Sequence, residues 1–93
     1  MNGLQDKVKR IWEGKNILCK FTKNSQEVHV SLAEEHFLPA FIMLEREGFE
    51  LVSLFAIEEF ENKKGITILY VLEKKKYAHL LIVERSIQKS SIQ

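Results

Sequence analysis

The sequence predicts an α+β fold in which a mostly antiparallel five-stranded sheet packs against helices. Two kinds of apolar pattern predict it. In two segments the apolar residues recur at helical spacing, and in five shorter segments they alternate or run continuously, as they do in strands. Polar turn sequences and single glycines separate these segments, so the predicted order of elements is α-β-β-α-β-β-β.

Two segments are predicted to be helical. Residues 3–14 place apolar side chains at positions i, i+4, i+7 and i+8, which lie on one helical face, and Gly14 provides a C-terminal stop. The second segment covers residues 31–48. Its Ser31 and Glu34 have the spacing of a capping box, in which each side chain satisfies a free backbone donor of the first helical turn.

Pro39 leaves two interpretations of the second helical segment open. Either a short turn at residues 32–37 precedes a helix that begins near Pro39, or one longer helix kinks there. The first interpretation is favoured, because a proline is tolerated in the first turn of a helix but costs about 3 kcal/mol in its interior. In both interpretations Gly48 ends the helix.

Five segments are predicted to be strands. The first two are joined by the turn sequence TKNSQ and are expected to pair as a hairpin. The third alternates from Phe49 to Ile57. The fourth, ITILYVL, is apolar on both faces, which predicts a central strand that is covered on each side. The predicted strands are residues 16–21, 27–31, 49–57, 66–72 and 77–84.

Length and composition are those of one ordinary globular domain. The chain has 93 residues, of which 45% are hydrophobic and 29% charged, and its net charge is +1. We assign residues 1–86 to a single domain and residues 87–93 to a polar tail that is expected to fray. The near-neutral charge gives no electrostatic argument for binding nucleic acid or an anionic membrane surface.

Cysteine usage and hydropathy predict an intracellular protein. The single Cys19 excludes an internal disulfide, and its place in an alternating strand predicts a small core residue. No apolar run approaches the roughly 20 residues that a membrane-spanning helix needs. We therefore expect a cytoplasmic protein with no direct membrane insertion, either free or held peripherally at the cytoplasmic face by partner subunits.

Histidines and lysines do not form a recognised binding motif. His29, His36 and His79 lack the short spacing of metal ligands, so no metal site is predicted. The lysine clusters at 63–64 and 74–76 lie in turns at opposite ends of one predicted strand, about 23 Å apart at 3.3 Å per residue. Two separated tips do not make one nucleic-acid footprint, and no nucleic acid is predicted as a partner.

Pairs of adjacent acids do not predict catalysis either. Glu58 and Glu59 follow each other on a strand, where neighbours point to opposite faces, so they cannot work as a facing acid and base. Glu34 and Glu35 have the same weakness on a helix. With no nucleophile motif and no phosphate-binding glycine loop, the sequence predicts no catalytic residue, no cofactor and no enzymatic activity of the chain by itself.

One long segment resembles a known family. The stretch LEREGFELVSLFAIEEFENKKGITILYVLE is similar to the middle of the 30-kDa-subunit family of respiratory-chain NADH dehydrogenase, which also occurs in energy-converting nickel–iron hydrogenases and formate hydrogenlyase-type complexes. The similarity covers about residues 27–84, and Glu58 stands where the family usually has aspartate. The family's acidic, arginine-bearing C-terminal segment has no counterpart before Gln93. The matching positions are Leu44, Gly48, Phe49, Leu51, Leu54, Glu58, Ile68, Tyr70 and Leu72.

The resemblance implies a non-catalytic accessory domain. Such a domain would dock to a large catalytic or electron-transfer subunit of an NADH dehydrogenase-like or nickel–iron hydrogenase-like complex and would bind no cofactor itself. Within the resemblance, Glu58 and Tyr70 have two interpretations. The favoured one is structural, with Glu58 anchoring the loop after its strand and Tyr70 burying its ring and reaching a polar partner. The other places both residues on the docking surface.

A second hypothesis comes from the sheet itself. Five strands leave two edges, and uncovered edges can pair with those of another copy by strand addition. The alternative function is therefore a free-standing homo-oligomeric binding or regulatory module. A third hypothesis is a small-ligand-binding domain with a pocket between helix and sheet.

Overall fold

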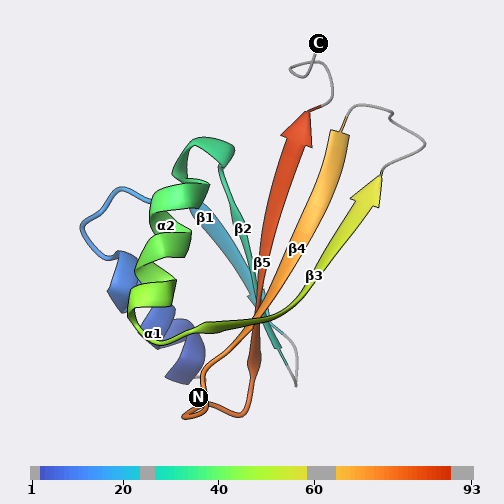
Figure 1. Cartoon of the computed structure of the whole chain (residues 1–93). Helices are drawn as coiled ribbons and strands as arrows, with labels where there is room; N and C mark the ends of the chain where they lie inside the picture. The colour runs from blue at the N-terminus through green and yellow to red at the C-terminus, as the bar shows by residue number, and fades with distance from the viewer. Residues whose placement is uncertain (1–2, 24–26, 59–64, 89–93) are drawn as a thin grey trace.

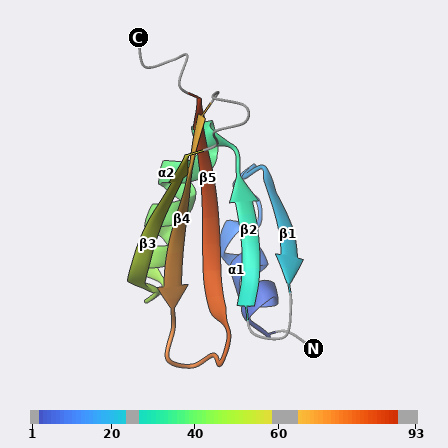
Figure 2. The ribbon, with the colours of Figure 1, turned by 90° about the vertical axis from the view of Figure 1, so that its right-hand side faces the viewer.

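Two helices lie on one face of a five-stranded sheet, and the other face carries no described helix (Figures 1 and 2). The computed structural model describes residues 3–23, 27–58 and 65–88. The order of elements confirms the predicted α-β-β-α-β-β-β, and the α+β class is confirmed with it. The elements are α1 (Gly3–Trp12), β1 (Cys19–Lys23), β2 (Glu27–Leu32), α2 (Glu34–Arg46), β3 (Glu50–Glu58), β4 (Gly65–Glu73) and β5 (Leu80–Gln88).

The strands are ordered β1-β2-β5-β4-β3 across the sheet. The β2–β5 pair is parallel and the other three pairs are antiparallel, so the sheet is mixed but mostly antiparallel, as predicted. The central strand is β5, and β4 lies between β5 and β3. This order makes β1 and β3 the two edges of the sheet.

The core fills the space between the helices and one face of β2, β5 and β4. On its sheet side, the core is made of apolar side chains that lie opposite each other on neighbouring strands. Such cross-strand partners point to the same face of a sheet. On its helix side, each helix contributes a stripe of apolar side chains. The burial of such a stripe drives an amphipathic helix onto a sheet. The fully buried members include Leu4 and Val8 of α1, Val28 and Val30 of β2, Ala40 and Leu44 of α2, Leu72 of β4, and Leu81 and Val83 of β5.

The two helices are tied to each other by a hydrogen bond as well as by packing. The indole Nε1 of Trp12, at the end of α1, donates to the backbone carbonyl of Ala40 in α2 at 3.2 Å. A buried indole N–H without a partner would be costly, so this bond fixes where α1 lies along α2. The Trp12 ring also lies against Phe21 of β1, with the ring centroids 6.2 Å apart.

The favoured interpretation of Pro39 is wrong. Helix α2 runs from Glu34 to Arg46 with Pro39 inside it and exposed. The buried stripe of Phe37, Ala40 and Leu44 continues across the proline, and the burial of that stripe outweighs one lost backbone hydrogen bond.

The predicted capping box is also absent. Ser31 lies in β2, and the residue before the helix is Ala33, which makes no side-chain cap bond. The carboxylate of Glu34 instead binds Arg85. The end of α2 does follow the prediction: Gly48 has φ +92°, and the amides of Gly48 and Phe49 donate back to the carbonyls of Glu45 and Leu44 at 3.1 Å each.

Strand boundaries differ from the predictions at several ends. The first strand begins at Cys19 rather than at residue 16, after the chain turns through Gly14 and Asn16 at positive φ. The last strand begins at Leu80 rather than at residue 77 and continues to Gln88, so two residues assigned to the tail belong to β5. The rest of the predicted tail, 89–93, lies outside the described residues.

The prediction that residues 66–72 are covered on both faces is wrong for the described part of the chain. Both helices pack against the same face of the sheet (Figure 2). On the open face of β4, Val71 is nevertheless buried, because it lies between Ser53 and Ile82 on the neighbouring strands. Cross-strand neighbours therefore account for part of the apolar pattern that the sequence presents on that face.

Candidate docking surface on β3

The edge strand β3 carries the main exposed apolar surface of the described chain. Among the described strands it pairs only with β4. Five of its side chains are each 50–53% exposed: Leu51, Val52, Leu54, Phe55 and Ile57. Single exposed apolar residues are common on proteins, but a contiguous apolar patch usually marks an interaction site.

Both faces of β3 contribute to this surface. Leu54 is opposite Tyr70, whose ring lies against α2, so Leu54 points to the helix side of the sheet. Phe55 and Ile57 point to the open side, because they alternate with Leu54 along the strand. A bulge between Leu51 and Ser53 breaks the predicted alternation from Phe49 to Ile57. Phe49 is therefore buried while Phe55 is half exposed.

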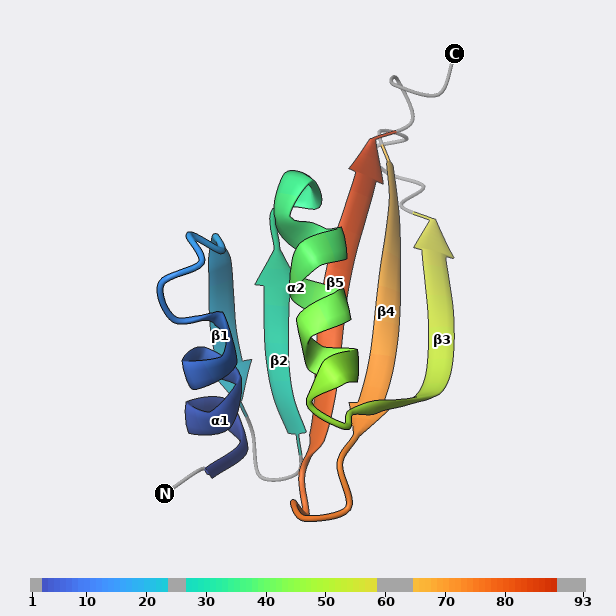
Figure 3. The same ribbon diagram turned by 60° about the vertical axis from the view of Figure 1, so that its left-hand side comes forward.

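The placement of α2 explains why the helix side of β3 is bare. Helix α2 packs on β5, and α1 lies beyond it toward β2 and β1 (Figure 3). Neither helix reaches over β3. Helix α2 adds two exposed side chains of its own, Leu38 at 63% and Ile42 at 38%. On the helical wheel both lie beyond Phe41, which contacts Tyr70 of β4, and so they extend the apolar surface from β3 toward α2.

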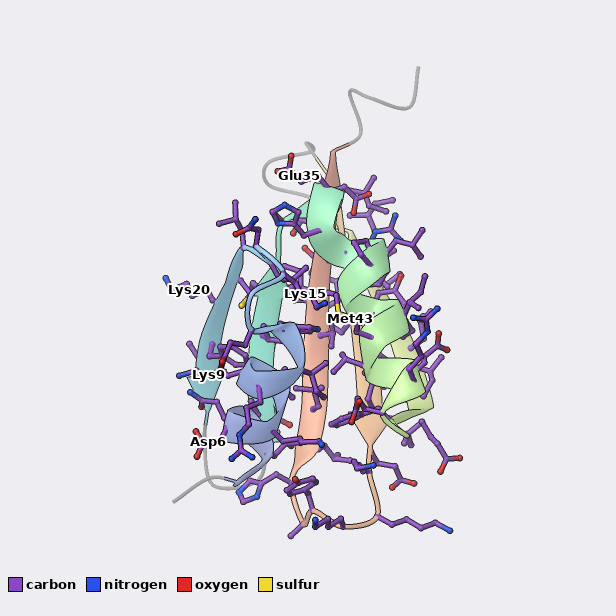
Figure 4. The ribbon with its side chains drawn as sticks, turned by 90° about the vertical axis from the view of Figure 1, so that its left-hand side faces the viewer. Asp6, Lys9, Lys15, Lys20, Glu35 and Met43 are labelled. Atoms are coloured by element: carbon purple, nitrogen blue, oxygen red, sulfur yellow. The ribbon has the colours of Figure 1, made fainter. Side chains whose placement is uncertain are left out.

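The opposite edge of the sheet is built differently. Strand β1 has five residues, against nine in β3, and two of those five are lysines. Lys9 of α1 and Lys20 of β1 lie along this edge (Figure 4), and the Lys9 Nζ is 5.6 Å from the centroid of the Phe21 ring. Short, lysine-bearing strands are the usual protection of a sheet edge against pairing. Between Leu51 and Ile57, β3 has no charged residue at all.

Tyr70 belongs to a cluster that joins α2 to the sheet. Its ring centroid lies 4.9 Å from that of Phe37 and 5.2 Å from that of Phe41. The Nη1 of Arg85 donates to the Tyr70 hydroxyl at 3.3 Å, and the guanidinium carbon lies 4.6 Å from the centroid of the Phe37 ring. Tyr70 thus has a half-buried ring and a polar partner, which is the geometry that the structural interpretation describes.

Arg85 is the centre of this cluster and was not singled out by the sequence. Its Nε and Nη2 donate to the two carboxylate oxygens of Glu34 at 2.7 and 2.9 Å, which is a bidentate pair. The hydrogen bonds from Arg85 lower the pKa of Glu34, and those bonds together with the one to Tyr70 raise the pKa of Arg85. The cluster therefore joins α2, β4 and β5 through one permanently charged side chain.

Glu58 and Tyr70 do not form a common site. Glu58 ends β3 opposite Ile66, whereas Tyr70 lies opposite Leu54. Four residues of strand separate those positions, about 13 Å at 3.3 Å per residue. Glu59 and residues 63–64 lie outside the described residues.

The remaining candidate residues are dispersed. His36 Nδ1 accepts a hydrogen bond from the Leu18 amide at 2.9 Å, and His29 Nε2 lies 3.2 Å from Glu84 Oε1. No three metal-binding side chains come together in the described ranges. Cys19 is exposed, which corrects the prediction of a core residue, because β1 proves to be an edge strand. Partial burial still raises the pKa of its thiol, so the thiolate is less available.

Replacing Glu34 with glutamine should make stability less dependent on acid pH. Because the folded-state pKa of Glu34 is below its ordinary value of 4.5, the pair stabilises the fold above that value and loses its effect as the pH falls through the folded-state pKa. Glu34 is half exposed, so the loss in Glu34→Gln should be at most about 1 kcal/mol at pH 7. Urea unfolding at pH 7 and pH 3 measures it. The difference in stability between the two proteins should narrow as the pH falls from 7 to 3. Glu35→Gln is the matched control, and a difference that is unchanged at pH 3 would contradict the assignment.

Comparison of the sequence with known proteins identifies no family for this chain. Within the described residues no helix is long and apolar enough to cross a membrane. No protein-family model matches this sequence, and no curated protein is significantly similar to it.

Proposed function

We propose that this chain is a non-catalytic protein-interaction domain that docks onto a protein partner through β3. The observation that carries the proposal is the half-exposed apolar row from Leu51 to Ile57, the uncharged stretch of an edge strand. An edge of this kind presents unpaired backbone donors and acceptors beside apolar side chains, which is what strand-addition partners use.

The contrast between the two edges supports a docking role. A chain that needed only solubility would protect both edges, and here β1 carries lysines while β3 does not. The Arg85 cluster also supports the proposal, because it anchors α2 over β5 and β4 and so leaves β3 uncovered. The proposed role needs no reactive side chain on the described surface.

A narrower version of the proposal comes from the sequence resemblance alone. The partner would then be a catalytic or electron-transfer subunit of an NADH dehydrogenase-like or hydrogenase-like complex, and this chain would be an accessory subunit at the cytoplasmic face of the membrane. In that version Glu58, at the end of β3, would lie next to the docking surface and Tyr70 would support it from behind. This version stays a prediction.

Site-specific photo-crosslinking in living cells tests the interaction. A photoreactive phenylalanine analogue at Phe55 should give a discrete covalent adduct, whereas the same analogue at Thr22, which is exposed on the other edge strand, should give none. Mass spectrometry of the adduct identifies what lies on β3. A redox-complex subunit would support the narrower version, and a second copy would give about twice 10.9 kDa. No adduct at Phe55, or equal adducts at both positions, would contradict the proposal.

A further inference from the structure

We propose that the occupant of β3 is a second copy of this chain, joined by antiparallel strand pairing about a two-fold axis at Phe55. The inference rests on the proposed function, because it names the partner for the same surface. A two-fold interface brings the same patch of both copies together, so each residue must be compatible with its symmetry mate. The uncharged run from Leu51 to Ile57 meets that condition along its whole length.

The bulge in β3 limits this pairing to registers that are centred in the regular part of the strand. Directly opposite residues of antiparallel strands point to the same face, so a symmetric pair must be centred on one residue. The regular part of β3 begins at Ser53, after the bulge. Centring on Phe55 pairs Ser53 with Ile57 and Leu54 with Ala56, and each pair shares a face. It also brings the two Phe55 rings together on the open face, where aromatic pairs add stabilisation.

Charge excludes the register centred on Leu54. Centring on Leu54 would place Glu50 of one copy opposite Glu58 of the other at both ends of the pair, and like charges directly opposite each other are destabilising. It would also place Leu51 opposite Ile57, which point to different faces because of the bulge. Centring on Phe55 avoids both conflicts, because it pairs residues of the regular part of β3, from Ser53 to Ile57, with each other.

The exposed apolar area of β3 sets the upper limit of the area that a dimer can bury. A half-exposed aliphatic or aromatic side chain presents roughly 100 Å² of apolar surface, so the five side chains of β3 present about 500 Å² per copy. The two copies together therefore present about 1,000 Å², which is the upper limit of what pairing these side chains can bury and the lower limit for a specific interface. The product is a continuous ten-stranded sheet with the helices of both copies on the same face, and it removes the unprotected edge from each copy.

Sedimentation equilibrium of the purified chain tests the dimer. The wild type should show a concentration-dependent mass that approaches twice 10.9 kDa. Phe55→Lys should weaken the self-association by at least about tenfold, because it sets two ammonium groups opposite each other in place of two rings. Thr22→Lys adds the same charge to the other edge and should leave the association unchanged. Circular dichroism checks that both variants are folded, which is expected because both side chains are exposed.

Cysteine cross-linking tests the register. In a Cys19→Ser background, Phe55→Cys should form a disulfide-linked dimer under mild oxidation, because opposite Cβ atoms lie about 5 Å apart. Ser53→Cys on the same face should not, since its symmetry mate would be about 13 Å away. A dimer that links through position 53 instead would overturn the register.

The outcomes separate this inference from the proposed function. A chain that stays monomeric at all concentrations, or a dimer that Phe55→Lys leaves intact, would overturn self-pairing. If the photoreactive group at Phe55 then captured a different protein, the interaction domain would stand and only its partner would change. If it captured nothing, both would fall.

Discussion

Phe37→Ala is expected to lower the free energy of unfolding by about 3–5 kcal/mol, whereas Phe55→Ala should change that of the monomer by less than about 1 kcal/mol. The two positions hold the same side chain in opposite surroundings. Phe37 is 5% exposed and Phe55 is 53% exposed. The Phe37 ring contacts the rings of Phe41 and Tyr70 and lies under the Arg85 guanidinium, so its removal leaves a cavity where α2 meets the sheet.

Urea unfolding at low protein concentration measures both changes. The monomer is then the main species, and unaltered m-values would show that the comparison is between like transitions. At high concentration Phe55→Ala should lose the additional stability that self-association gives the wild type, because a partner that binds only the folded state stabilises it by mass action. Equal losses for Phe37→Ala and Phe55→Ala at low concentration would contradict the exposure of β3 and the docking surface with it.

Local pattern was enough to predict the types and order of the elements. Helix α1 and strand β2 are each specified by a few apolar positions at the right period, and β4 by a continuous apolar run. That information is present within each segment. Exact ends were less predictable, as β5 shows, because Leu80–Gln88 is defined by its pairing with β2 and β4 rather than by its own sequence.

Strand order was not predictable from any local signal. The parallel β2–β5 pair joins residues 27–32 to residues 80–85. Neither segment contains a sequence signal that identifies the other as its pairing partner. The docking surface depends on that order. The apolar sequence of β3 is what a half-buried strand would have, and only its place at the edge, away from α2, exposes it.

Arg85 is a site residue whose inward-facing position could be predicted from the pattern of its strand. It alternates with Leu81 and Val83, and so occupies an inward-facing position of β5. A charge at an inward-facing position needs a partner, which the topology provides in Glu34 and Tyr70. The alternation could therefore predict that Arg85 is paired but could not identify its partners, which come from segments 51 and 15 residues away.

Pro39→Ala is expected to raise the free energy of unfolding by about 2–2.6 kcal/mol. A proline in a helix interior is about 3 kcal/mol less favourable than alanine, because it cannot donate to the carbonyl four residues earlier, here that of Glu35. Part of this gain is offset, since alanine gives the unfolded chain about 0.4–1 kcal/mol more conformational entropy. Pro39 is exposed, so its ring contributes little packing that alanine would lose.

The sign of this change distinguishes the two structures that the sequence allowed for α2. If the helix began at Pro39, the proline would occupy the first turn, where its fixed φ is favourable and its missing N–H has no cost, and alanine would be neutral or destabilising. If the helix begins at Glu34, as in the structure, alanine restores a backbone hydrogen bond and stabilises the protein. Thermal and urea unfolding measure the change, and Glu45→Ala, which is exposed on the same helix and replaces no proline, should shift stability by less than about 0.5 kcal/mol. A loss of stability in Pro39→Ala would mean that the segment before Pro39 is not helical in solution; Glu34 would then no longer be held on the first turn of α2, where it meets Arg85.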